Sequence, residues 1–366
     1  MKIPMQNLVA QHTCIEDGFN VGLDGLLQNT DFVRGAAIKK FEESFEQWLG
    51  VPHVIAVANG TDALSIALAA MTIMPGDEVL VPAQTWISTA SSVVNAGAVP
   101  VFVDIKSLDV PLMDEGTLSK HITARTVGII PVHLHGLPCN MPKIMEFACE
   151  NKLWVIEDCA QAHGATINGK VVGSFGDIGT FSFYPGKNLG AYGDAGCVVT
   201  GSELLANWIR KYANHGSIKK SEFEIFGINS RMDSFQAIVL CEKLKHLKQW
   251  NDQRKMKVAY YQKEISQIKS IQLPVVDYDI NACAWHQFFV LSNQRDKLIE
   301  HLHERNISHS LIYKKSLNDE KVFQKFRRQD LPVSTLFSST HVCLPLCPFI
   351  TQEEQDYVCT ALNDFI

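Results

Sequence analysis

The feature that most constrains the fold is a series of short apolar runs between residues 53 and 200, separated by helical or mixed segments. Seven runs have the length of strands: HVIAVAN, DEVLVPAQ, VPVFVDI, VGIIPVHLHG, LWVIEDCAQ, IGTFSFYP and AGCVVTG. Strands that are buried on both faces read as continuous apolar runs, and the helices between them supply the crossovers of a parallel sheet. The pattern predicts an α/β fold whose mostly parallel, seven-stranded sheet is flanked by helices.

The pattern changes after residue 201. The segments LLANWIRKY and FQAIVLCEKLKHLKQWNDQRKMKVAYYQKEI have helical periodicity, and the second is long enough to link two domains. Beyond it, the strand-like HQFFVLS and VCLPL accompany the helical DKLIEHLHERN and EEQDYVCTAL. We therefore expect a large α/β domain over residues 1–251, including an N-terminal helical segment, and a smaller α+β domain over residues 252–366.

Composition narrows the class of protein. Of the 366 residues, 46% are hydrophobic and 20% are charged, as in an ordinary soluble globular protein. No run approaches the roughly 20 apolar residues that span a bilayer, and the N-terminus has no secretory pattern. Ten cysteines without repeated spacing favour reduced thiols, so we expect a cytoplasmic protein. The net charge of −6 offers no basic surface for nucleic acid.

Polar clusters follow the predicted strands, at the edge where ligands bind in such sheets. Lys187 lies among glycines in FSFYPGKNLGAYGDAG and could form a Schiff base, although a single loop lysine is more often simply solvated. Asp158 ends another strand, in VIEDCAQAHGA. Its carboxylate could keep a pyridine nitrogen protonated and make the ring an electron sink, or it could only cap the next turn. Gln161 could hydrogen-bond the phenolic oxygen of such a ring, whereas by default it is a loop amide.

A phosphate site is indicated in ANGTDALSIALAAM, where a predicted strand meets a helix. The N–H groups and the dipole at a helix N-terminus attract anions, which favours a phosphate near Gly60 and Thr61. Alternatively, Asn59 or Thr61 merely caps the helix. Ser182 is a plausible second phosphate ligand from its own strand end. Trp86, in PAQTWISTAS, is placed to stack on a cofactor ring, unless it is a partly buried core residue.

Six ordered motifs together resemble the nucleotide-sugar aminotransferase family, within the fold-type-I pyridoxal-phosphate enzymes: ANGTDAL, GDEVLVPAQTW, PVHLHG, VIEDCAQAHGA, FSFYPGKNLGAYGDAG and GINSRMDSFQAI. The resemblance covers most of residues 30–310. It implies pyridoxal 5′-phosphate as the cofactor, with Lys187 as the Schiff-base lysine, Asp158 at the pyridine nitrogen and Gln161 at the phenolic oxygen. The remaining implied cofactor contacts are Trp86 on the ring and Gly60, Thr61 and Ser182 around the phosphate.

The resemblance also implies partners. Asn229 of GINSR would reach the phosphate from a second subunit, which makes a homodimer with shared active sites the minimal active unit. L-glutamate would be the amino donor and a nucleotide-linked keto sugar the acceptor. Because some members carry His in place of the lysine and perform a dehydration, Lys187 indicates transamination.

The residues around Lys187 also indicate which carbon of the sugar is aminated. YPGKNLGAYGDAG is similar to members that aminate C3 of a UDP- or dTDP-linked 3-keto sugar, for amino sugars of cell-surface polysaccharides such as O-antigen. Members acting at C4 more often carry a Thr-Thr-Gly-like stretch after the lysine, and C4 amination is our alternative.

At two places on the sugar side of the site, the sequence differs from the residues that are frequent in the family. Ile312, Tyr313 and Lys314 stand where many members have His-Tyr-Pro, and Phe223 stands where Tyr is frequent. The candidate substrate contacts are Tyr184, Lys219, Lys220, Arg231 and Tyr313.

Two other classes of function were weighed. Two sets of side chains could suggest a metal-dependent hydrolase: His133, His135 and Cys139, and His341, Cys343 and Cys347. These spacings fit no standard closed zinc site, so we expect no metal. A regulatory or sensory protein could keep the fold and bind the cofactor without catalysis, but the joint presence of Lys187, Asp158 and Gln161 speaks against it.

Overall fold

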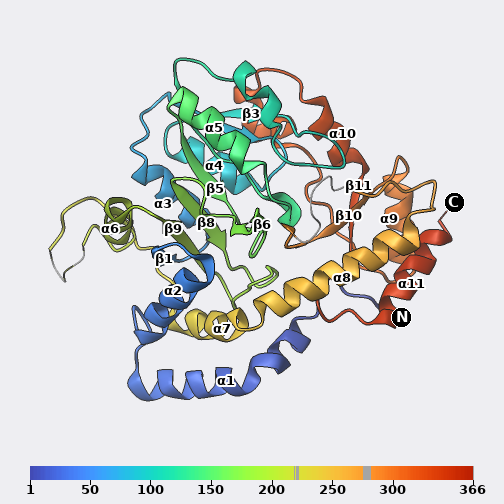
Figure 1. Ribbon diagram of the computed structural model, residues 1–366, viewed down its shortest axis with the longest axis horizontal. Helices are drawn as coiled ribbons and strands as arrows, with labels where there is room; N and C mark the ends of the chain where they lie inside the picture. Colours follow the sequence, from blue (N-terminus) through green and yellow to red (C-terminus); the bar gives the residue numbers. More distant parts are fainter. Residues whose placement is uncertain (218, 220–221, 275–281, 366) are drawn as a thin grey trace.

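The computed structural model describes residues 1–365 except 218, 220–221 and 275–281. Its centre is a seven-stranded sheet in the order β1-β9-β8-β5-β4-β2-β3 (Figure 1). The strands are β1 (His53–Val57), β2 (Glu78–Pro82), β3 (Val99–Val103), β4 (Thr126–Ile129), β5 (Trp154–Asp158), β8 (Ile178–Ser182) and β9 (Gly196–Thr200). Each corresponds to one of the seven apolar runs, so the predicted strand set is confirmed.

The strand directions also match the prediction. Neighbouring strands from β3 to β8 run parallel, whereas β9 is antiparallel to both β8 and β1. The carboxyl ends of β2, β4, β5 and β8 therefore lie along one edge of the sheet, and the loops that follow these strands are brought together there.

Helices cover both faces of the sheet, and the side chains of β9 show why. Val198 packs in a cluster with Ala67, while its neighbours Cys197 and Val199 pack in another cluster with Phe45. Successive strand residues point to opposite faces, so an uninterrupted apolar run requires cover on both sides. The helices of the first cluster are α3 (Gly60–Ala70), α4 (Ile87–Asn95) and α6 (Glu203–Tyr212); those of the second are α2 (Ala36–Leu49) and α7 (Ser234–Leu244).

The remaining elements lie partly against this sheet and partly beside it (Figure 1). Helix α8 (Leu247–Ile265) runs from the end of α7 to α11 (Figure 1). The other elements are α5 (Met141–Asn151), β10 (Phe288–Leu291), α9 (Arg295–Glu304), α10 (Pro332–Thr340), β11 (His341–Leu344) and α11 (Gln352–Asn363), with the hairpin of β6 (Thr166–Ile167) and β7 (Lys170–Val171). Short 3₁₀ helices are η1 (Glu115–Lys120), η2 (Leu134–Gly136), η4 (Leu317–Asp319) and η5 (Lys321–Phe326).

The long helical pattern predicted after residue 233 is two helices, not one. The N–H of His246 donates to the carbonyl of Lys243 over 3.0 Å, a tight i→i+3 turn that separates α7 from α8. Helix α8 then runs without a break through residue 251, the proposed domain boundary. Apolar residues from both proposed domains, such as Ile129 and Phe289, also share one cluster. The division into two domains therefore stays a prediction.

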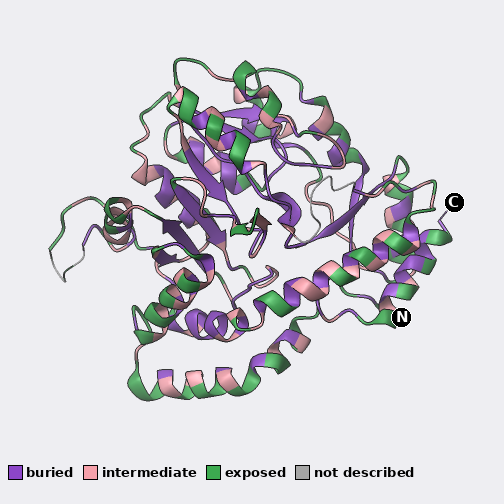
Figure 2. Cartoon of the chain, viewed as in Figure 1, coloured by how far each residue is buried: buried purple, intermediate pink, exposed green. Residues whose placement is uncertain are grey.

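Helix α1 (Leu8–Asn29) packs on α7, and its outer side is exposed, unlike the buried strands of the sheet (Figure 2). Val9 and Val21 project from this outer side. Within the described part of the chain, none of the helices is both long enough and apolar enough to cross a membrane.

Candidate active site

Lys187 lies in a closed loop between β8 and β9. The N–H of Phe183 donates to Ala195, and the N–H of Ala191 donates back to Phe183, so the two ends of the loop meet. A side chain at Gly190 would place its Cβ 2.3 Å from the carbonyl oxygen of Pro185, which explains the glycine at this position. The loop therefore presents Lys187 from a compact and defined backbone.

Lys187 is half-buried. Burial lowers the pKa of Lys187 to about 8, and the negative charge of Asp158 opposes that shift. Among the residues that the structure describes, the side-chain nitrogen makes no hydrogen bond. An amine with these properties is a good nucleophile and proton carrier near neutral pH.

Asp158, at the end of β5, is 5% exposed. Burial raises its pKa, while hydrogen bonds from the Ala160 N–H (3.1 Å) and the Thr89 hydroxyl (2.9 Å) act in the opposite direction, as does the charge of Lys187. The Thr89 hydroxyl is itself 3.0 Å from that of Thr85. These contacts fix the orientation of the carboxylate at the end of β5, where it interacts with the charge of Lys187.

Gln161 lies three residues beyond Asp158, and its amide is fixed at both ends. Its Oε1 accepts the backbone N–H of His135 over 2.7 Å, and its Nε2 donates to the hydroxyl of Tyr313 over 3.1 Å. The ring of Tyr313 lies 5.5 Å from that of Trp86. The structure thus brings Gln161, Trp86 and Tyr313 together, although they belong to three separate segments.

The predicted phosphate residues meet at the start of α3. A Cβ on Gly60 would lie 2.6 Å from the Cβ of Ser182, so Gly60 and Ser182 are in direct contact. Asn59 caps the helix by accepting the N–H of Asp62, whereas Thr61 pairs with the hydroxyl of Ser88 over 2.7 Å. The first N–H groups of the helix have no acceptor within it, and they face the region where an anion would be stabilised.

The remaining predicted residues do not join this group. Asn229 and Lys219 are exposed on the segment between α6 and α7, and Tyr184 is exposed at the start of the Lys187 loop. Arg231 lines a hollow of about 210 Å³ together with Arg34 and Arg210. Lys220 lies outside the described residues.

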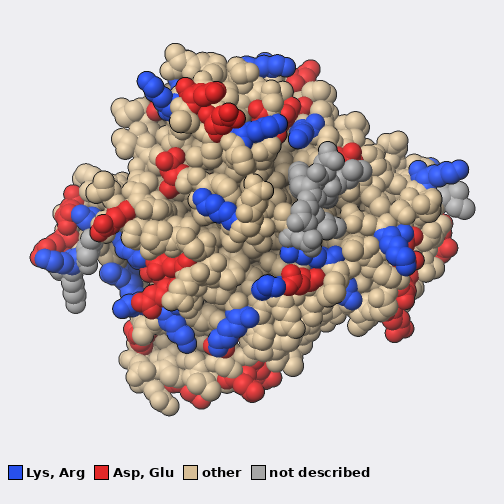
Figure 3. Space-filling view, in the orientation of Figure 1, with Lys and Arg blue, Asp and Glu red and all other residues tan. Residues whose placement is uncertain are grey.

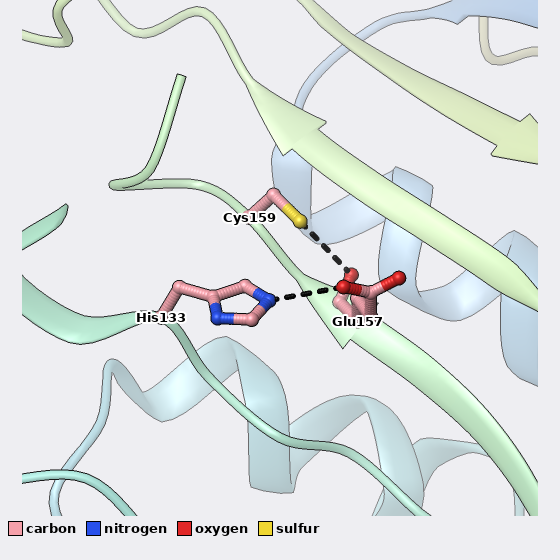
Figure 4. A group of neighbouring side chains, drawn as sticks. All are labelled: His133, Glu157 and Cys159. Carbon is pink, nitrogen blue, oxygen red and sulfur yellow. Dashed lines mark hydrogen bonds and ion pairs between the residues drawn. The ribbon is translucent and has the colours of Figure 1, made fainter. Parts of the chain in front are cut away.

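Of the residues considered for metal binding, His133 and His341 have hydrogen-bond partners at both ring nitrogens. His133 lies near Glu157 and Cys159 (Figure 4). Among the described residues, these three form a group that could offer ligand atoms to a metal, and His135 and Cys139 do not belong to it. The Glu157 carboxylate lies 3.2 Å from Nε2 of His133, within hydrogen-bonding distance. It also accepts hydrogen bonds from the backbone N–H groups of Gly173, Phe175 and Gly176.

The other ring nitrogen of His133 accepts the N–H of Cys139, so the ring is occupied on both sides. Burial raises the pKa of the Cys159 thiol well above its ordinary value, which disfavours the thiolate that a metal requires. In the second set, the two ring nitrogens of His341 bond the backbone of Ile312 and Phe337. His133 and His341 therefore have the contacts of structural histidines.

Sequence reasoning missed Thr89, the hydroxyl partner of Asp158. It stands in the QTWISTA motif, but nothing in the local pattern indicates that the first turn of α4 faces the end of β5. A search for hydroxyl residues in the helices that follow the strand-end loops would have included it.

Comparison with known proteins decides the family. A model of the DegT/DnrJ/EryC1/StrS aminotransferase family matches residues 14–363. This chain belongs to that family. A UDP-N-acetyl-3-dehydro-alpha-D-glucosamine 3-aminotransferase of Acidithiobacillus ferrooxidans is 39% identical over 361 residues, covering 99% of this chain and 97% of the relative.

Two further proteins are similar to this chain over its whole length. A protein of Geobacillus stearothermophilus named as a pleiotropic regulatory protein is 35% identical, covering 100% of this chain and 99% of the relative. The crystal structure of S. venezuelae DesV in complex with a ketimine intermediate is 35% identical and covers 100% of this chain and 98% of its own, with a TM-score of 0.95. The predicted family and fold class are confirmed.

Proposed function

We propose that this protein is a pyridoxal 5′-phosphate-dependent aminotransferase that transfers an amino group from L-glutamate to C3 of a nucleotide-linked keto sugar. The observation that supports it best is that the charges of Lys187 and Asp158 interact, while Ser182, at the end of the strand before Lys187, lies against Gly60. Gln161 follows Asp158 by three residues. The name of the A. ferrooxidans relative supports the same reaction and the same carbon.

The residues present fit the chemistry of the proposed cofactor. Gly60, Thr61 and Ser182 would hold its phosphate, Asp158 its ring nitrogen and Gln161 its phenolic oxygen, with Trp86 against the ring. The closeness of Gly60 to Ser182 leaves no room for a Cβ, as expected where a backbone must approach a phosphate. When bound, the protonated pyridine ring supplies an electron sink for a carbanion next to nitrogen.

Lys187 would attach the cofactor and, once released by the amino donor, move protons at its Nζ atom. A group works best as both acid and base when its pKa is near the working pH. With a pKa of about 8, the Lys187 amine can accept a proton at one step and return it at another.

Asp158 would hold the ring-nitrogen proton throughout. A buried carboxylate resists ionisation, and this one is stabilised as an anion by the Ala160 N–H and the Thr89 hydroxyl. Those two donors leave the charge of the carboxylate available to the ring nitrogen.

The substrate would enter past exposed side chains at the mouth of the site. Trp86 and Tyr184 are 57% and 60% exposed, and Tyr313 contacts both Trp86 and Gln161. The net charge of the chain is −6, and basic and acidic side chains are interspersed on the face shown in Figure 3. A diphosphate would therefore need particular basic residues. We propose Arg231 and Lys219 for this role. Within one subunit they lie apart from the Lys187 group, so they would act across the interface of a homodimer.

A homodimer is part of this proposal. Phe223 and Phe226 are 70% and 101% exposed on the segment before Asn229. Exposed aromatic residues favour a protein interface, and a second copy covering them would bring Asn229 of the partner subunit towards the phosphate. A monomer in sedimentation measurements at micromolar concentration would contradict this assembly.

The reaction is tested by incubating the protein with glutamate, cofactor and a panel of UDP- and dTDP-linked 3-keto and 4-keto sugars. We expect 2-oxoglutarate in amounts equal to the amino sugar, with the new nitrogen on C3. Amination of only the 4-keto sugars would replace the C3 assignment with the C4 alternative. Bound cofactor that releases no 2-oxoglutarate would favour a regulatory protein, the function suggested by the name of the G. stearothermophilus relative.

The contact between Gly60 and Ser182 at the proposed phosphate site gives a second prediction. In Gly60→Ala, the added methyl group meets Ser182 at 2.6 Å, and the resulting overpacking of about 1–3 kcal/mol should weaken pyridoxal-phosphate binding about tenfold. Binding of pyridoxal, which lacks the phosphate, should change little. Gly25→Ala is the matched control, since a Cβ there meets nothing within 4 Å. Equal losses for both ligands in spectroscopic titrations would place the phosphate elsewhere.

A further inference from the structure

Asn251, on helix α8, makes hydrogen bonds to two active-site loops at once. Its Nδ2 donates to the backbone carbonyl of His163 over 2.7 Å, and its Oδ1 accepts from Nδ2 of Asn188 over 2.9 Å. His163 lies two residues after Gln161, and Asn188 directly follows Lys187. One side chain, distant in sequence from both, therefore connects the loop of Asp158 and Gln161 to the loop of Lys187.

The other polar atoms of Asn188 are also engaged. Its second amide hydrogen is directed to the carbonyl of Ala284 over 2.8 Å, and its Oδ1 lies 3.1 Å from Nδ1 of His286. Burial and the nearby charge of Lys187 lower the pKa of His286 well below its ordinary value, so the ring is neutral and can donate from Nδ1. Asn188, Asn251 and His286 are all at least nine-tenths buried, where hydrogen bonds fix orientation.

The surrounding chain holds Asn251 close to both loops. Gly164 has a φ of +91°, and a Cβ there would lie 2.6 Å from Nδ2 of Asn251. One helical turn further, buried Arg254 donates to the carbonyls of Trp285, His286 and Leu346, which holds this face of α8 against the chain that supports Asn188. Neither α8 nor the loop after His163 can move away without breaking these contacts.

We propose that Asn251 is a positioning residue that sets the separation between Lys187 and the pair Asp158 and Gln161. This inference rests on the proposed function, in which those three side chains act on one bound ring. Active-site groups must be held within a fraction of an ångström of the productive geometry, and a displacement near 1 Å can cost about 10²-fold in rate. Because Asn251 bonds to Asn188 and to the backbone of His163, which are neighbours of the three acting side chains, its effect is exerted through the two loops.

The test uses the full-length protein and Asn251→Leu, which keeps the side-chain size and removes both hydrogen bonds. In the cofactor-free protein, hydrogen–deuterium exchange should become faster in segments 159–165 and 184–192. In the loaded protein, the pH midpoint of the absorbance change of the Lys187-bound cofactor should shift. We expect kcat to fall about 10- to 100-fold, with the KM for glutamate little changed.

Asp252→Asn is the matched control, because Asp252 is the next residue of α8 and its carboxylate pairs with Lys248 and Lys255 of the same helix. All three measurements should match those of the wild type. If Asn251→Leu does not fold, Asn251→Asp keeps the acceptor for Asn188 and loses the donor to His163. Exchange should then become faster in segment 159–165 alone.

Two results separate this inference from the proposed function. An Asn251→Leu protein with a lower melting temperature, but with wild-type exchange in both segments, titration midpoint and kcat, would show a purely structural role and overturn the inference. Wild-type protein that never attaches the cofactor to Lys187 would overturn the proposed function instead. The exchange experiment on cofactor-free protein would still report whether Asn251 holds the two loops.

Discussion

Lys187→Ala is expected to abolish amino transfer, with a loss of more than about 10⁴-fold in kcat because both the covalent attachment and the proton-transfer group are removed. The variant should still bind pyridoxal phosphate through the Gly60 and Ser182 region and the Asp158 carboxylate. It should not become covalently labelled when borohydride is added to the complex. Stopped assays for 2-oxoglutarate, together with mass spectrometry of the reduced protein, measure both effects.

Two comparisons sharpen the Lys187 experiment. Lys263→Ala removes an exposed lysine from the last turn of α8 and should have wild-type activity and labelling. A small primary amine added to Lys187→Ala should restore part of the lost rate, because it can carry the proton that the side chain carried. Activity of Lys187→Ala equal to the wild type would exclude Lys187 as the acting amine.

Asp158→Asn is expected to have the second largest effect. The amide is almost the same size as the carboxylate but carries no charge, so the ring nitrogen would lose the group that holds its proton. We expect kcat to fall by about 10²–10³-fold, the scale seen when one preorganised electrostatic partner is removed. Cofactor binding and covalent attachment to Lys187 should persist, which separates this variant from Lys187→Ala.

Asp177→Asn is the control for this substitution. Asp177 accepts the backbone N–H of Val155 near the opposite end of the same strand, so the variant makes the same chemical change away from the site. The kcat of Thr89→Val should lie between those of Asp158→Asn and Asp177→Asn. This variant removes one hydrogen bond from the Asp158 carboxylate but leaves its charge. Asp158→Asn with wild-type kcat would mean that the ring nitrogen has another partner.

The group around the proposed cofactor site was largely predictable because its members follow predicted strands. Asp158 ends β5, Lys187 follows β8, and Gly60 begins the helix after β1. The apolar runs place these strands in one sheet, and the loops beyond neighbouring strand ends are close in space whatever their distance in sequence. Chemically suitable residues in such loops therefore form a candidate site before any coordinates are known.

Contacts made by helices were not predictable in the same way. Thr89 reaches Asp158 across 69 positions, and Asn251 reaches His163 across 88. Helical periodicity shows which residues share a face but not what that face meets. The turn at His246, which separates α7 from α8 and sets the course of α8, has no Gly or Pro to mark it.

By itself, the sequence of this protein determined the seven strands, the mostly parallel sheet, the loops at its edge and, through six motifs, the aminotransferase family. These features follow from hydrophobic periodicity and from residue types at short spacing, both of which are local. Only the tertiary structure decided that Tyr313 meets Gln161, that Gly60 touches Ser182 and that Asn251 holds two loops together. Those contacts depend on how distant segments pack, and packing is a property of the whole chain.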